Sequence, residues 1–170
     1  MHAPRSSSSG RALSDPRKLA TPLKDRWFED YVRGEVFEFG DYLVTEAEIV
    51  EFARRYDPQP FHVDAAVAGE SNFGGLVASG WMTAAVLMRM MCDHFISPAS
   101  AMGSPGVDEL RWLRPVRPGD RLHARVTVMD AHRSQSKPDR GAVMLRQEAI
   151  NQAGEVVMSL VGRSLHRCRS

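Results

Sequence analysis

The sequence has few cysteines, no excess of charge of either sign and no long apolar run, and each absence narrows the function. The 22 Lys and Arg residues nearly balance the 21 Asp and Glu residues, and no basic run with interleaved aromatics is present. Both facts argue against a nucleic-acid partner. The two cysteines, Cys92 and Cys168, lack metal-ligand spacing and give no reason to expect a disulfide. A reducing compartment is therefore the default.

Sorting signals are also scarce. The N-terminus has no apolar segment of the secretory type. The most apolar stretch, residues 81–96, is short for a bilayer and carries Arg89 and Asp93, so we expect no membrane span. Residues 1–25 are rich in Ser, Arg and Pro and predict a flexible tail. They also loosely resemble a transit peptide, but a plain disordered extension explains them better, so we expect a cytoplasmic protein, with an organelle matrix as the alternative.

The remaining residues, 26–170, suit a single domain that buries roughly 70% of its unfolded surface. Thr45 and Glu48 have capping-box spacing, and the apolar residues that follow recur at helical spacing up to Tyr56. This pattern predicts a helix that ends at Asp57-Pro58 and delivers Asp57 from a fixed point.

Asp57 and His62 are separated by a segment stiffened by Pro58 and Pro60. Proline fixes φ and lacks an N–H, so we expect a rigid, non-helical loop that holds a carboxylate and an imidazole in one relation. An acid/base pair needs such a geometry. The alternative is that Asp-Pro is an ordinary helix stop and His62 a loop histidine. His62 and Asp64 could also be a metal pair, but two ligands are few, and water-facing side chains explain them better.

A glycine pair, Gly74 and Gly75, precedes an almost wholly apolar segment, residues 80–95, for which Ser79 is a plausible N-cap. A helix that is apolar all round is buried on most sides, and we interpret its methionines as core filler rather than a cofactor site. Residues 36–39 and 42–44 predict two short strands around a turn at Gly40-Asp41, and residues 122–128, 142–150 and 155–167 predict longer strands. The order favours an α+β fold in which an antiparallel sheet wraps one long buried helix.

Several segments together resemble the MaoC-like dehydratase family, hot-dog-fold proteins that include the (R)-specific enoyl-CoA hydratases. The segments are residues 57–62, 73–75, 78–81 and 110–120, and the resemblance covers roughly residues 28–166 in the right order. It implies a single hot-dog domain that works as a homodimer in acyl-CoA or fatty-acid metabolism. It also implies a lyase that hydrates an enoyl thioester without a metal or redox cofactor.

The resemblance further implies roles for individual residues. Asp57 and His62 match the catalytic Asp and His that activate water, and Gly80 matches the glycine whose N–H binds the thioester oxygen. A helix N-terminus favours developing negative charge. Gln59 stands where the family motif usually has Asn, and Ser79 stands where many hydratases have His. We interpret both departures as marks of a different acyl group.

We expect the substrate-binding residues to include Ser79, Gln59, Gly75, Arg111 and Arg117. Arginine can fork onto a phosphate, so candidates for the phosphates of coenzyme A are cationic. They are Arg111, Arg114, Arg117, Lys137 and Arg140, although a solvated basic edge explains the same residues.

Three functions remain open from the sequence. The first is reversible hydration of an enoyl-CoA or enoyl-carrier-protein thioester. The second is non-catalytic acyl-CoA binding, which the presence of both Asp57 and His62 disfavours. The third is a hot-dog thioesterase, which commonly carries an acidic residue in the buried helix. Thr83 is the only polar residue in the first two turns of that helix here, which disfavours hydrolysis.

Overall fold

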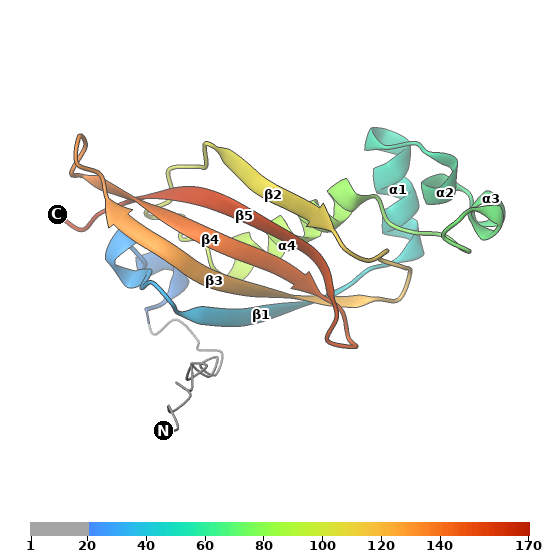
Figure 1. Cartoon of the computed structure of the whole chain (residues 1–170), viewed down its shortest axis with the longest axis horizontal. Helices are drawn as coiled ribbons and strands as arrows, with labels where there is room; N and C mark the ends of the chain where they lie inside the picture. Colours follow the sequence, from blue (N-terminus) through green and yellow to red (C-terminus); the bar gives the residue numbers. More distant parts are fainter. Residues whose placement is uncertain (1–20) are drawn as a thin grey trace, which may run out of the picture.

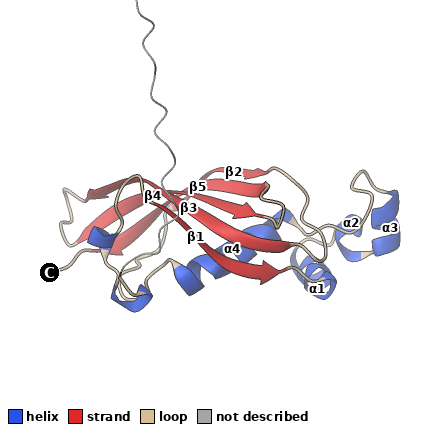
Figure 2. Cartoon of the chain, turned by 90° about the horizontal axis from the view of Figure 1, so that it is seen from below, coloured by secondary structure: helices blue, strands red, loops and turns tan. Residues whose placement is uncertain are grey.

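The computed structural model describes residues 21–170, which form one curved antiparallel sheet around a long helix, α4 (Figures 1 and 2). The strand order across the sheet is β1-β3-β4-β5-β2. The strands are β1 (Val36–Leu43), β2 (Gly106–Trp112), β3 (Arg121–Arg133), β4 (Arg140–Ile150) and β5 (Val156–Arg167). The helices are α1 (Glu46–Tyr56), α2 (Pro60–Val63), α3 (Ala65–Glu70) and α4 (Gly80–His94).

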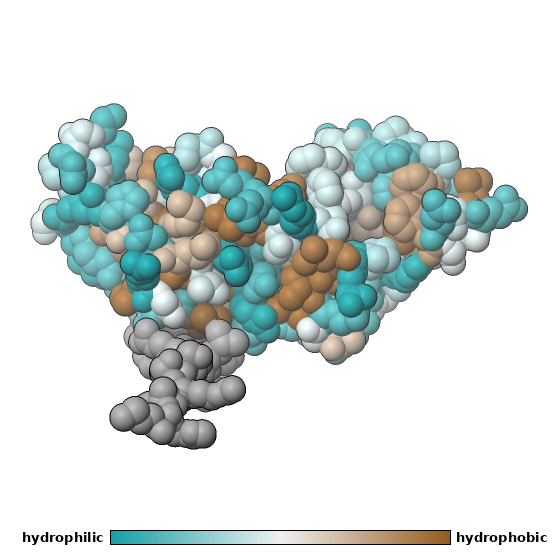
Figure 3. Space-filling model, viewed as in Figure 1, coloured by the Kyte–Doolittle hydropathy of each residue, from teal (hydrophilic) through white to brown (hydrophobic). Residues whose placement is uncertain are grey.

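The expected wrapping of a sheet around one helix is confirmed. Along β3, Leu122, Ala124, Val126 and Val128 are buried and alternate with partly exposed residues, as the period-2 pattern predicts. The same alternation runs through β4, so one face of the sheet is apolar and packs on α4. The opposite face mixes hydrophilic and hydrophobic residues (Figure 3).

The prediction of a turn at Gly40-Asp41 is wrong, because β1 is one continuous strand with an irregularity between Phe39 and Tyr42. Gly40 has a φ of 82°, which a glycine adopts without steric cost. A Cβ there would meet the Met90 side chain of α4. The glycine therefore permits a bulge and a close approach of β1 to α4, where the sequence indicated a turn.

The predicted start and end of α1 are confirmed. The Thr45 hydroxyl accepts from the Glu48 N–H, the Glu48 carboxylate accepts from the Thr45 N–H, and Asp57 is the C-cap. The prediction that residues 57–62 are non-helical is wrong in its second half. Pro60 opens α2, because proline at the first helical position has its φ preset and no N–H to satisfy. His62 therefore lies on a helical turn.

Ser79 is the N-cap of α4, accepting from the Trp81 N–H at 3.2 Å. Met82, Met90 and Met91 lie in the core, as expected for core filler. The helix is not buried on all sides: Trp81, Ala85, Met88 and Cys92 form an exposed stripe along it. This stripe is apolar, and no other part of the described chain covers it.

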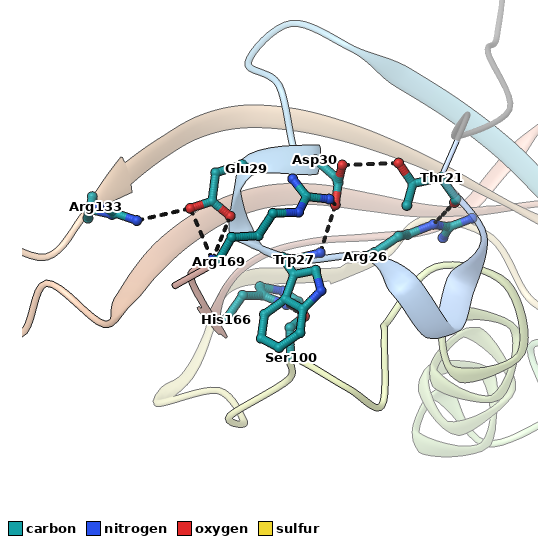
Figure 4. A network of polar contacts seen from close by, with 9 residues as sticks. All are labelled: Thr21, Arg26, Trp27, Glu29, Asp30, Ser100, Arg133, His166 and Arg169. Carbon is teal, nitrogen blue, oxygen red and sulfur yellow. Dashed lines mark hydrogen bonds and ion pairs between the residues drawn. The ribbon is translucent and has the colours of Figure 1, made fainter.

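The N-terminal segment packs against the C-terminal end of α4. Arg26 is buried and donates from Nη1 to the carbonyls of His94 and Phe95, at 2.8 and 3.1 Å. The Arg169 main-chain N–H and the Arg133 guanidinium both donate to the Glu29 carboxylate (Figure 4). Of the tail expected over residues 1–25, residues 1–20 lie outside the described part, while 23–25 form a 3-10 turn. The boundary at residue 25 stays a prediction.

Candidate active site

Asp57 and His62 are positioned by two successive elements, the C-terminal end of α1 and the short helix α2. Asp57 is the C-cap of α1, and its N–H donates to the Ala53 carbonyl at 2.9 Å. The chain then runs extended to Gln59, and α2 presents His62 one turn later, at the end of the molecule where α1, α2 and α3 gather (Figure 1). The His62 Nε2 and Asp57 Oδ2 atoms are 3.5 Å apart. The structure thus brings the two residues together.

The His62 ring is fixed by a main-chain acceptor. Its Nδ1 lies 2.7 Å from the Val77 carbonyl oxygen, which can only accept, so Nδ1 carries a proton. In neutral His62 the other nitrogen, Nε2, is therefore an acceptor that faces the Asp57 carboxylate. His62 is 6% exposed and lies on α2, so the alternative of a loop histidine is wrong.

Both oxygens of Asp57 have donors of their own. The Ser79 hydroxyl donates to Oδ2 at 2.7 Å, and the Gln59 amide donates to Oδ1 at 2.8 Å. The Ser79 hydrogen bond, then that of Gln59, and then the nearby His62 lower the pKa of Asp57, while partial burial opposes them. Asp57 is therefore ionised at neutral pH.

Gly80 lies beside this pair at the first position of α4. Within the described residues its N–H has no hydrogen-bond partner, as expected for the first N–H groups of a helix. A Cβ at Gly80 would collide with the Trp112 indole. Only glycine fits under this ring, so Trp112 packs directly over the Cα of Gly80.

A cavity of about 450 Å³ opens in front of these groups. One wall comes from α2 and the loop before α4, and the opposite wall comes from the segment after β2. Its lining residues are Asp57, Gln59, Phe61, His62, Phe73, Val77, Ala78, Gly80, Trp81, Thr83, Trp112, Leu113, Arg114, Pro115 and Val116. The cavity is thus largely apolar, with the Asp57–His62 pair and the Gly80 N–H at one place on its surface, as a site for an apolar ligand with one polar reacting group requires.

The predicted substrate-binding residues separate into different places. Gln59 lines the cavity but uses its amide on Asp57, and Ser79 is fully buried with its hydroxyl on the same carboxylate. Arg117 donates from Nη2 to the Phe73 carbonyl at 2.5 Å, and Gly75 lies under its guanidinium. Arg111 is exposed on β2 and donates to the neighbouring Leu110 carbonyl.

The remaining candidates for phosphate binding are also dispersed. Arg114 lines the cavity and lies 3.3 Å from Glu155. Lys137 and Arg140 lie at the β3–β4 turn, at the other end of the sheet from α2 and α3 (Figure 1), and Arg140 pairs with Asp139. Asp64 caps α3 by accepting from two N–H groups rather than pairing with His62. Across residues 21–170 no three His, Cys, Asp or Glu side chains cluster in a way that could hold a metal ion.

The aromatic walls of the cavity were missed by the sequence reasoning. Phe61 packs edge-on against the His62 ring at 4.5 Å and against Phe73 at 5.1 Å. Trp81 and Trp112 also line the cavity and meet edge-on, with ring centroids 5.2 Å apart. The only signal in the sequence was that large aromatic residues stand inside or beside the motif segments.

Comparisons with known proteins agree with this architecture. Residues 31–151 match the family described as MaoC like domain. A MaoC-like dehydratase from Rhodospirillum rubrum superposes with a TM-score of 0.80 and 39% identity, covering 85% of this chain and 99% of that one. An R-hydratase from Pseudomonas aeruginosa shares the fold, with a TM-score of 0.66 and 24% identity over 84% of this chain and 86% of the other.

One relative of known activity is larger than this chain. Mesaconyl-CoA hydratase of Cereibacter sphaeroides is 42% identical over 144 residues, which are 80% of this chain but 39% of that protein. Within residues 21–170, no helix combines the length and hydropathy needed to cross a membrane. The family match and the curved sheet around α4 together identify the chain as a hot-dog-fold member of the MaoC-like dehydratase family.

Proposed function

We propose that the protein reversibly hydrates a trans-2-enoyl thioester, with Asp57 and His62 activating the water. The observation that carries this proposal is the pair of acceptors, His62 Nε2 and Asp57 Oδ2, that face each other at 3.5 Å. Two acceptors cannot hydrogen-bond to each other, but one water can donate to both. Such a water is polarised toward hydroxide and fixed in position.

The reaction balances within these groups. His62 Nε2 takes one proton of the water as its oxygen bonds to C3 of the enoyl group. The electron pair of the double bond moves toward the thioester oxygen, which becomes enolate-like. A proton returned to C2 completes the addition of H and OH, and the reverse sequence is dehydration. Only protons and water are transferred.

The Gly80 N–H is the proposed donor to the thioester oxygen. It stands at the positive end of α4, has no partner within the described chain and lines the same cavity as His62. Donors already placed where charge develops need no rearrangement during the reaction. The apolar remainder of the cavity suits an acyl chain.

The position of Arg114 favours a substrate whose acyl group carries a carboxylate, that is, a thioester of a dicarboxylic acid. It is the one Lys or Arg that lines the cavity in the described chain, and a guanidinium binds carboxylates well. The Cereibacter relative is named for mesaconyl-CoA, whose acyl group carries one free carboxylate in addition to the thioester. Mesaconyl-CoA therefore belongs in the substrate panel beside crotonyl-CoA and longer enoyl-CoAs, and carrier-protein thioesters form a further arm.

We also propose a homodimer. The β2 edge strand is exposed along almost its whole length, and the apolar stripe of α4 (Trp81, Ala85, Met88 and Cys92) is open beside it. An open strand edge next to an apolar helix face is a surface that a second copy can cover. This proposal places the thioester cavity near the interface.

A spectrophotometric assay over this panel separates the three functions. Loss of the conjugated enoyl absorbance without free thiol means hydration, which we expect. Release of free thiol means hydrolysis, and binding without either change means a non-catalytic acyl-CoA-binding protein. Either of the last two results across the whole panel would refute the proposed reaction.

A further inference from the structure

Arg117 connects the two walls of the cavity. We propose that Arg117 is a positioning residue that holds the Phe73 wall in place and thereby sets which acyl groups fit. The proposal rests on the proposed function for the identity of the ligand, a thioester. It gives Arg117 a role different from the phosphate contact expected from the sequence.

The connecting hydrogen bond is specific. Arg117 follows directly after the segment that forms one wall of the cavity, and its Nη2 donates to the Phe73 carbonyl on the other wall at 2.5 Å. Its own main chain is anchored, since its N–H donates to the Asp120 carboxylate at 2.8 Å. Within the described chain this is the only hydrogen bond from residues 112–117 to residues 71–75.

Further along the loop that carries Phe73, the Ala78 N–H donates to the Val116 carbonyl on the other wall at 2.8 Å, but around Phe73 the other main-chain hydrogen bonds stay on its own side. The Gly74 N–H donates to the Ser71 carbonyl, and the Gly75 N–H donates to the Ala68 carbonyl of α3. Gly75 has a φ of 152°, and a Cβ there would lie 3.3 Å from Arg117 Nη1. The absence of a side chain at Gly75 leaves room for the guanidinium to reach across the loop.

Phe73 is connected to the proposed catalytic pair through packed aromatic rings. Its ring lies 5.1 Å from Phe61, which in turn packs against His62 at 4.5 Å. About 40% of the Phe73 surface is exposed, and the residue lines the cavity. Release of the Phe73 carbonyl would therefore let one apolar wall move outward while His62 keeps its separate bond to Val77.

Binding of non-reacting saturated acyl-CoAs tests this role without requiring turnover. The variants are Arg117→Met, which keeps the length but loses the donors, and Arg117→Lys, which keeps one donor. Arg33→Met is the matched control, because Arg33 is an exposed arginine in the turn before β1 and does not line the cavity. Titration calorimetry gives Kd for butyryl-CoA and octanoyl-CoA. Hydrogen exchange without ligand reports the loop through the Gly74 and Gly75 amides.

We expect Arg117→Met to shift the ratio of the two Kd values toward octanoyl-CoA by about fourfold, on the scale of one methylene buried. Exchange at Gly74 and Gly75 should speed up. Arg117→Lys should restore both readouts in part, and Arg33→Met should change neither. Unchanged exchange, or an unchanged Kd ratio, in Arg117→Met would overturn the assignment. Failure of the proposed reaction would look different: wild-type protein would not hydrate enoyl thioesters, while the Kd ratio would still shift.

Discussion

Ser79 and Gln59 supply the hydrogen bonds that hold the Asp57 carboxylate, one on each oxygen. From the sequence, both residues are predicted to bind the substrate. The structure uses them on the carboxylate, where they lower the pKa of Asp57. A group with a lowered pKa remains ionised further into the acid range, and it adds stability at neutral pH that is lost only as pH falls through the folded-state pKa.

Replacing either donor by alanine should therefore change the pH dependence of turnover. Without its donor, the pKa of Asp57 rises toward its ordinary value, so the acid limb of the kcat/KM profile should move to higher pH. Ser79→Ala also loses the N-cap of α4, which costs about 1 kcal/mol of unfolding free energy, whereas exposed Gln59→Ala should not. Gln135→Ala, in the exposed β3–β4 turn, is the control. An acid limb that stays in place in both variants would argue against an ionised Asp57 in the reaction.

Any substitution of Gly80 adds a Cβ that collides with Trp112, so the loss of the N–H must be measured by comparing two Gly80 variants. Gly80→Ala and Gly80→Pro both add a Cβ against the indole, but only proline removes the N–H. Proline suits the first position of a helix, and the extended Ser79 backbone (ψ 140°) suits the residue before it. We expect kcat of Gly80→Pro to be about a hundredfold below that of Gly80→Ala. Equal kcat values in two folded variants would remove the oxyanion role of Gly80.

These residues also mark what could be predicted from the sequence. Asp57 and His62 could be paired because they are only five positions apart and two prolines restrict the segment between them. The contact of Trp112 with Gly80, and that of Arg117 with Phe73 across 44 positions, depend on how distant segments pack. No local pattern encodes such contacts, so the sequence does not predict the aromatic walls of the cavity.

At the scale of elements, local chemistry predicted helix ends better than it predicted irregularities. The Thr45–Glu48 box and the Ser79 cap satisfy N–H groups within a few residues, so the sequence suffices. The Gly40-Asp41 pair favours a turn, because a glycine next to Asp usually marks one. Pairing of β1 with β3 on both sides of the bulge overrode that preference.

β5 carries a second titratable group with a consequence for stability. His166 is 1% exposed, its two ring nitrogens lie near the hydroxyls of Ser100 and Ser164, and Tyr31 packs on it at 4.4 Å (Figure 4 shows His166 and Ser100). Burial lowers the pKa of His166 to about 4. The unfolded chain binds this proton at about pH 6.5, so the folded state loses stability as pH falls from about 6.5 to about 4.

The free energy of unfolding should fall by roughly 3 kcal/mol over that window because of His166. Urea unfolding of wild-type protein and of His166→Gln at several pH values measures this term. The variant is expected to be less stable at neutral pH but to show a flatter dependence on acid. His132→Gln, which changes an exposed histidine, is the control. Parallel curves for wild type and His166→Gln would contradict the account.

For the whole molecule, the open apolar stripe of α4 and the exposed β2 edge lead to a prediction about assembly. Light scattering after size exclusion should give about twice the 18.9 kDa of one chain. Met88→Glu should lower this mass because it places a charge on the stripe, where Met88 is 48% exposed. Val67→Glu is the matched control, since Val67 is 45% exposed on α3, away from the stripe. A wild-type mass of one chain would refute the homodimer.

The central claim is that Asp57 and His62 act together on one water. Asp57→Asn keeps the shape of the side chain and loses its charge. His62→Asn places an amide N–H where Nδ1–H donates to Val77 and removes the base, which suits a buried histidine better than alanine.

The most direct test is a double-mutant cycle on the hydration rate of the best enoyl thioester in the panel. Each single variant should lower kcat by roughly a hundredfold to ten-thousandfold. Because both residues hold the same water, the double variant should be little slower than the poorer single variant. Losses that multiply in the double variant, or a single variant with wild-type turnover, would contradict the proposed pair.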